Sequence, residues 1–285
     1  MSKTSATSLT PNQEKAILDF VRDELYALGT DKDSAQRIIL KAGDLKTTVR
    51  ETFITLGSMR YRSEEVASKY GYTLAVKPIC EQLLALMKYF PGLDPGPALT
   101  CSKSLGELPE GAEGWFVIPK PEKVAKTYGE ALETALTHLA AQRGGKFTNW
   151  RDGKLGPKYL RLTEKTQKAL EALSATQSGD FLIIPAQFGI RHRGRSVRRA
   201  REVFVAKEFG LGPFETAIML LTHPKRLARY ENLFIDCPGA EYDYSAFGSF
   251  DRAPYFDFCG GRLRFGTDLV SDYYDYYGAA SAFLP

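Results

Sequence analysis

The densest set of side chains suited to chemistry lies at residues 191–207, where the sequence reads RHRGRSVRRAREVFVAK. Six arginines and one lysine stand there against one glutamate, a net charge of +6, whereas the whole chain carries only +4. The planar guanidinium of arginine forms bidentate hydrogen bonds with phosphate oxygens. The segment therefore predicts a binding surface for nucleic acid, RNA or DNA, or for another polyanion. The predicted contact residues are Arg191, His192, Arg193, Arg195, Arg198 and Arg199.

The same arginines have competing interpretations. Residues 232–285 hold eight acidic side chains and three arginines, a net charge of −5. Segments of opposite charge can neutralise each other within one molecule or between copies. Pairing of the run with this acidic tail, self-association through the two segments, and a catalytic anion site are therefore alternatives.

Carboxylates behind a predicted strand form the second candidate site. Asp236 ends an apolar run, with Glu241 and Asp243 close behind it. Ligands of α/β proteins bind at the carboxyl ends of strands, and carboxylate oxygens suit Mg²⁺. Asp236, Glu241 and Asp243 therefore predict, as an alternative function, a nuclease-like metal-dependent enzyme that acts on phosphate esters with Mg²⁺. Their spacing matches no known metal-binding loop, and the nucleic-acid binder itself needs no cofactor.

Tyrosines are interleaved with these acids. Seven of them lie between Tyr242 and Tyr277, in stretches such as EYDYSAF and SDYYDYYG. One interpretation is a set of strands with buried rings and outward acids. The other is an aromatic platform on which nucleic-acid bases stack.

Complete catalytic signatures are absent from the sequence, so whether the protein is an enzyme stays open. There is no P-loop, no dinucleotide-binding glycine motif and no nucleophile elbow. His138 and His223 fit structural roles inside or between helices. His192 stands among arginines, which we expect to lower its pKa and favour the neutral ring.

Neighbouring elements explain how the arginines would be presented. FLIIP at residues 181–185 predicts a buried strand, after which the residues up to Arg195 form an extended arm. Ser196 can cap a following helix that ends near Gly210. The arm and the first helical turn would then project their arginines together.

Further strands and helices place this segment in an α+β fold. Residues 115–119 and 233–237 predict two more buried strands, and helices alternate with them. The sequence YFDFCGGRLRFG predicts a hairpin with a two-residue Gly260–Gly261 turn. In that hairpin Asp257 stands opposite Arg264.

The N-terminal part is predicted to be helical. Helices are expected from Pro11, between Asp33 and Gly43, and from Asp44 to Gly57. The stretch that begins SEEVASKYGYTLAV predicts a helical hairpin, with a weak helix-turn-helix resemblance that Pro78 interrupts. The domain prediction is a helical region 1–92, a Pro/Gly-rich connector 93–113 without regular structure, and an α+β domain 114–285.

Composition places the chain among ordinary globular proteins. It is 285 residues long, with 44% hydrophobic and 25% charged residues. No apolar run approaches the roughly 20 residues of a membrane helix, and no signal peptide is recognisable. We therefore expect a cytoplasmic protein without membrane contact.

The sequence also bears a resemblance to a family. The stretch FGIRHRGRSVRRAREVF, with EFGLGPF and MLLTHPKRL behind it, resembles uncharacterised proteins of candidate-phylum bacteria. The resemblance covers the chain from Gly114 onward. It implies a bacterial origin but no activity, because that family has none assigned.

Three functions follow, in order of preference. The first is a nucleic-acid binder that uses the arginine-rich arm and helix start. The second is the metal-dependent enzyme. The third is a protein-interaction module that docks its basic helix on an acidic partner.

Overall fold

The computed structural model describes residues 11–40 and 60–284, and the chain divides into two compact units after Phe53. In the first unit, α1 (Pro11–Ala27) ends where Gly29 takes a φ of +63°. It is followed by α2 (Lys32–Leu40), which begins after Asp31, whose carboxylate accepts the Ser34 N–H at 2.7 Å. The helix predicted from Asp44 lies outside the described residues.

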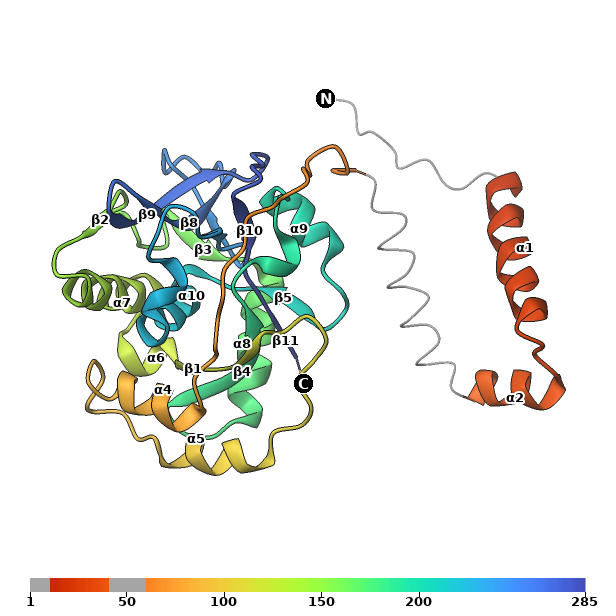
Figure 1. The fold of residues 1–285 in the computed structure, drawn as a ribbon, viewed down its shortest axis with the longest axis horizontal. Coiled ribbons are helices and arrows are strands. Elements are labelled where there is room, and N and C mark those ends of the chain that lie inside the picture. The colour runs from red at the N-terminus through yellow and green to blue at the C-terminus, as the bar shows by residue number, and fades with distance from the viewer. Residues whose placement is uncertain (1–10, 41–59, 285) are drawn as a thin grey trace. The chain divides into compact units, whose positions relative to one another are not determined.

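The second unit combines helices with two sheets (Figure 1). Its helices are α4 (Ile79–Leu86), α5 (Gly96–Cys101), α6 (Pro121–Val124), α7 (Tyr128–Gln142), α8 (Glu164–Thr176), α9 (Val197–Val203) and α10 (Pro213–Thr222). Its strands are β1 (Gly114–Pro119), β2 (Phe147–Asn149), β3 (Leu160–Leu162), β4 (Phe181–Gln187), β5 (Glu208–Gly210), β6 (Phe234–Asp236), β7 (Ala240–Tyr242), β8 (Arg252–Cys259), β9 (Arg262–Leu269), β10 (Tyr277–Ala279) and β11 (Ser281–Phe283). The α+β prediction is confirmed.

The smaller sheet is antiparallel and has the strand order β1-β4-β11-β5. All seven residues of β4 are buried, as the apolar run FLIIP predicted. β1 and β6 likewise occupy the predicted runs at 115–119 and 233–237. The helix α10 lies against β1 and α7, and each of its ten residues is buried. It forms the centre of the hydrophobic core.

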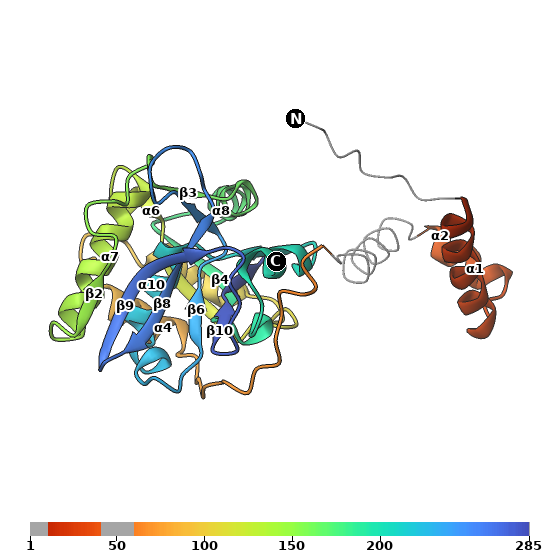
Figure 2. The ribbon, with the colours of Figure 1, turned by 90° about the horizontal axis from the view of Figure 1, so that it is seen from above.

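The larger sheet has the order β10-β6-β8-β7-β3, and β9 joins β8 to β2 (Figure 2). The predicted hairpin is β8–β9. Asp257 pairs in register with Arg264, whose Nε donates to its carboxylate at 2.7 Å. Gly260 and Gly261 have φ values of +59° and +73°, the left-handed conformation that a two-residue hairpin turn of this type requires.

Residues 60–78 form an extended strap, so the predicted helical hairpin at this position is wrong. The strap runs from beside α9 towards the start of α4 (Figure 1, orange), and single backbone bridges join Glu65 to Arg195 and Gly71 to Asn232. Long-range pairing has overridden local helix propensity here. Pro78 does start α4, as its fixed φ favours.

The Pro/Gly-rich stretch 93–113 lies within the second unit and contains regular structure after all. The short helix α5 begins there, with Pro97 in its first turn, where a missing N–H costs nothing. Thr127 caps α7 through a capping box with Glu130, which separates α7 from α6 before it. Within the described residues no helix is long and apolar enough to cross a membrane.

Candidate functional site

The arginine run has the predicted local structure. Strand β4 leads through Gly189, at a φ of +119°, into a short 3-10 helix at Ile190–His192. Ser196 then caps α9 by accepting the Arg199 N–H at 3.0 Å. The helix is shorter than predicted, because it ends at Val203 and strand β5 spans Glu208–Gly210.

The arginines of this run are engaged with carboxylates of the strap. The Arg198 guanidinium holds Glu64, which also accepts the Ser196 hydroxyl at 2.7 Å. Glu65 receives both Arg195, at 2.9 Å, and Arg199, at 3.3 Å. The hydrogen bonds from Arg198 and Ser196 lower the pKa of Glu64 and outweigh the effect of its burial, which raises it. The principal partners are thus the two glutamates of the strap. The alternative of pairing with the C-terminal tail is seen at Arg201, whose guanidinium lies 3.6 Å from Glu241.

His192 is buried, with 2% of its surface exposed. Arg195 donates to its Nδ1 at 3.0 Å, so its Nε2 carries the hydrogen that faces Glu208 at 2.7 Å. Burial lowers its pKa, and the nearby arginines add to that effect against Glu208. The expected direction is confirmed, although burial is the larger cause.

Exposure separates the six predicted contact residues, all of which the structure describes. Arg193 is exposed, and Arg199 is 7% exposed. Arg191, Arg195 and Arg198 are half-buried, and the Arg191 guanidinium lies 3.4 Å from Glu208. Most of this face is therefore committed to holding the strap and β5 in place.

The carboxylates Asp236, Glu241 and Asp243 do not converge. Glu241 forms an ion pair with Arg161 at 2.8 Å, and Asp243 is buried beneath its own loop. Asp236 lies at the end of β6, in a separate recess. In the described part of the chain, no three acidic, histidine or cysteine side chains are arranged to hold a metal ion. The predicted metal trio is thus not assembled in this structure.

A second surface collects aromatic rings and guanidinium groups beside the β7–β8 loop, residues 243–251. Its two halves are neighbours because β3 pairs antiparallel with β7, which places Arg161 opposite Glu241. The segment 150–161 carries four basic residues and one acid, a net charge of +3. We call this the arginine–aromatic surface; its members are Trp150, Arg151, Arg161, Tyr244, Phe247, Phe250 and Arg252.

Guanidinium groups of this surface lie on its rings. The Cζ atom of Arg161 is 3.8 Å from the centroid of Phe250. The Cζ atoms of Arg151 and Arg252 lie 4.8 Å and 5.1 Å from the centroid of Tyr244. Contacts of this kind hold both partners at the surface at little desolvation cost.

Three aromatic residues of this surface are left open to solvent. Phe247 is 93% exposed, Trp150 is 57% exposed and Tyr244 is 56% exposed. Exposed aromatic rings that gather on one surface are typical of a binding site. The loop that carries two of them is nevertheless ordered by one buried acid.

Asp243 organises this loop. One carboxylate oxygen accepts the Ser245 and Ala246 N–H groups, both at 2.9 Å. The other accepts the N–H groups of Gly248 and Ser249. These bonds lower the pKa of Asp243 against the opposing effect of its burial. A carboxylate that satisfies several backbone donors presents Phe247 on a fixed framework.

The sequence pointed to half of this surface. An aromatic platform for bases is one of the two interpretations of EYDYSAF, and the sequence does not connect Trp150 and Arg151 with it. The missing information was the pairing of β3 with β7, which joins positions about eighty residues apart.

Comparison of the chain with protein-family models, with curated proteins and with solved structures yields no match.

Proposed function

We propose that the protein binds single-stranded nucleic acid on the arginine–aromatic surface. The observation that carries the proposal is the 93% exposure of Phe247, on the same ordered loop as the exposed Tyr244. A large apolar ring that an ordered loop holds in solvent offers its faces to a ligand. Nucleic-acid bases are flat partners that suit such rings.

Chemistry favours a single strand over other polyanions. Unpaired bases offer their faces for stacking on Phe247, Tyr244 and Trp150, which each contribute about 1 to 3 kcal/mol when a base stacks on them. Arg151 and Arg252 lie beside Tyr244 and can reach the phosphates between successive bases. A polyanion without bases would gain only the electrostatic part of this binding.

Fluorescence anisotropy with a labelled single-stranded oligonucleotide at low salt tests the proposal. We expect Phe247→Ala to weaken binding about fivefold or more, the equivalent of one lost stacking contact. The matched control is Tyr230→Ala, which removes a 54% exposed ring that packs on Phe234 of β6, away from β7 and β3. The control variant should bind as the parent does.

A charge-reversing substitution tests whether nucleic acid binds to the arginine run instead of the arginine–aromatic surface. Arg193→Glu alters the exposed residue of the run and leaves the arginine–aromatic surface unchanged. Absence of binding by the parent protein would contradict the proposal. So would strong loss in Arg193→Glu without loss in Phe247→Ala, because it would return the binding site to the run.

A further inference from the structure

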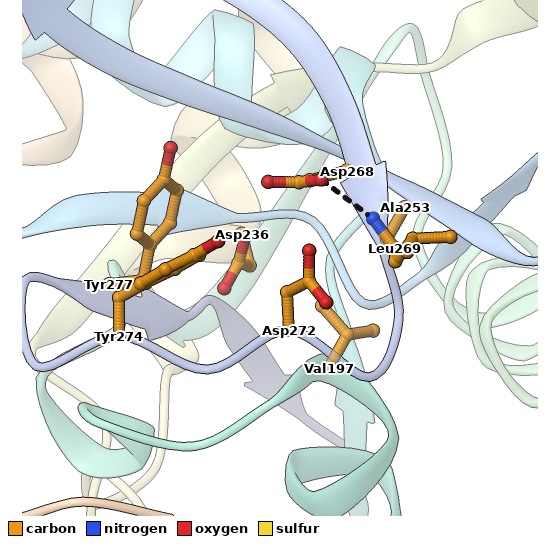
Figure 3. A pocket seen from close by; sticks show the side chains of 8 residues that line it. All are labelled: Val197, Asp236, Ala253, Asp268, Leu269, Asp272, Tyr274 and Tyr277. Atoms are coloured by element: carbon orange, nitrogen blue, oxygen red, sulfur yellow. Dashed lines mark hydrogen bonds between the residues drawn. The ribbon is translucent and has the colours of Figure 1, made fainter. Parts of the chain in front are cut away.

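A recess at the edge of the larger sheet gathers three aspartates that the proposed nucleic-acid surface does not use (Figure 3). Asp236 comes from the end of β6, Asp268 from β9, and Asp272 from the turn behind β9. The remaining lining residues are Val197, Ala253, Leu269, Tyr274 and Tyr277.

Asp236 is the deepest of the three acids. It is 8% exposed, and no hydrogen-bond donor of the described chain reaches its carboxylate, although it lines the recess. The hydrogen bond that Ala280 donates to this residue goes to its backbone carbonyl, at 2.9 Å. A buried carboxylate without a donor is costly, so this side chain is free to accept hydrogen bonds from a ligand.

The three acids disfavour each other's ionisation at this site. Burial raises the pKa of Asp236 well above its ordinary value, and Asp268 and Asp272 raise it further. Burial and Asp268 raise the pKa of Asp272, while Arg252 acts in the opposite direction. A cation that replaces the proton would compensate the carboxylate charge, so the recess favours a positively charged occupant that donates hydrogen bonds.

Size and chemistry narrow the class of occupant. The free volume is about 10 Å³, the room for about one water-sized group. Among the described residues these acids do not form a metal-ligating set. An alkylammonium head has a comparable size and three N–H donors, one for each carboxylate.

Tyrosines at the rim suit the rest of such a ligand. Tyr274 and Tyr277 line the recess, and Tyr274 is 39% exposed. Aromatic faces attract alkylammonium cations and cover the methylene groups attached to them. Val197 and Ala253 make the remaining wall apolar.

We propose that this acidic recess binds the primary ammonium group of an aliphatic amine, with Asp236 as its innermost hydrogen-bond acceptor. Free diamines and lysine side chains share this chemistry. The site is distinct from the arginine–aromatic surface, so either proposal can fail without the other.

Isothermal titration calorimetry of the full chain with putrescine at pH 8 tests the inference. We expect Asp236→Asn to weaken putrescine binding at least about tenfold, equivalent to about 1.4 kcal/mol. Glu133→Gln, which removes an exposed charge on α7, should bind as the parent does. The bis-trimethylammonium analogue of putrescine should not bind, because its head exceeds the recess and has no N–H donor. A parallel titration with N-acetyl-lysine amide distinguishes a lysine side chain from a free amine.

Three outcomes would overturn the inference. They are absence of putrescine binding at millimolar concentration, equal binding of putrescine and its quaternary analogue, and unchanged binding in Asp236→Asn. Thermal unfolding of the parent and of Asp236→Asn shows whether the substitution impairs folding. Asp236→Asn removes a carboxylate whose pKa is raised in the folded state, so at pH 8 it should unfold at no lower temperature than the parent.

Discussion

Glu215 of α10 shows at the scale of one residue how burial sets protonation. It is 1% exposed, and one of its carboxylate oxygens has no hydrogen-bond partner. The other accepts the Tyr128 hydroxyl at 2.8 Å. Burial raises the pKa of Glu215 to about 7, although Tyr128 opposes the shift.

This shift makes stability depend on pH. Because the folded state holds the proton more tightly than the unfolded state, stability falls as the pH rises from about 4.5 through about 7. Glu215→Gln should therefore stabilise the protein at pH 8, by at most about 3 kcal/mol, and not at pH 4. Thermal melts of both proteins across this range check the prediction. A variant that is equally destabilised at both pH values would contradict it.

Single residues were predictable where the signal is local. Ser196 and Thr163 cap their helices as their sequence positions indicate. The role of Asp243 was not predictable in this way. Its carboxylate was considered as a metal ligand, whereas its partners are backbone N–H groups of the loop that follows it. Acidic residues before Ser and Gly in a loop favour such turns, because their carboxylates accept backbone N–H groups a few residues further on.

The β7–β8 loop can be tested as an element. Asp243→Ala leaves several backbone donors without their acceptor, at a cost of about 1 to 3 kcal/mol. We expect faster proteolysis at residues 243–251 and weaker oligonucleotide binding. The control Asp251→Ala removes an exposed acid at the end of the same loop. Equal protease resistance in both variants would show that Asp243 does not order the loop.

The strap is the element that sequence analysis missed. The spacing of its apolar residues resembles that of a helix. Its glutamates contact residues more than 120 positions away in the sequence, as in the pairing of Glu65 with Arg195. Local periodicity carries no information about such contacts. The same separation along the sequence explains why the arginines of the run were expected to face solvent or the acidic tail and not the strap.

A substitution in the strap tests this assignment. Glu64→Ala removes the acceptor of Ser196 and Arg198 and should cost about 1 to 3 kcal/mol of unfolding free energy. It should also raise hydrogen exchange in residues 61–70. Glu122→Ala, at an exposed position of α6, serves as the control and should change neither. Equal urea midpoints for the two variants would argue against the strap as a structural clamp.

At the scale of the molecule, electrostatics predicts how binding responds to salt. Arg151 and Arg252 would contact about two phosphates, which gives a slope of about −1 for the logarithm of the binding constant against the logarithm of salt concentration. Titrations from low to physiological salt measure this slope. A slope steeper than about −4 would indicate that the arginine run binds as well, and a slope near zero would exclude phosphate contacts.

The fold class was predictable because buried strands, caps and the Gly260–Gly261 turn each have local signatures. The arrangement of the two sheets and the strap was not predictable, because it depends on which strands pair across long sequence distances. The candidate surface arises from that arrangement. Its aromatic half was visible in the sequence, and its position beside Trp150 and Arg151 was not.

Ultraviolet crosslinking of a single-stranded RNA to the full chain, followed by peptide mass spectrometry, tests the central claim most directly. The account predicts crosslinked peptides from residues 150–161 and 241–252, with adducts on Trp150, Tyr244 or Phe247. Crosslinks confined to residues 191–201, or no crosslinks at a concentration where binding is saturated, would contradict it.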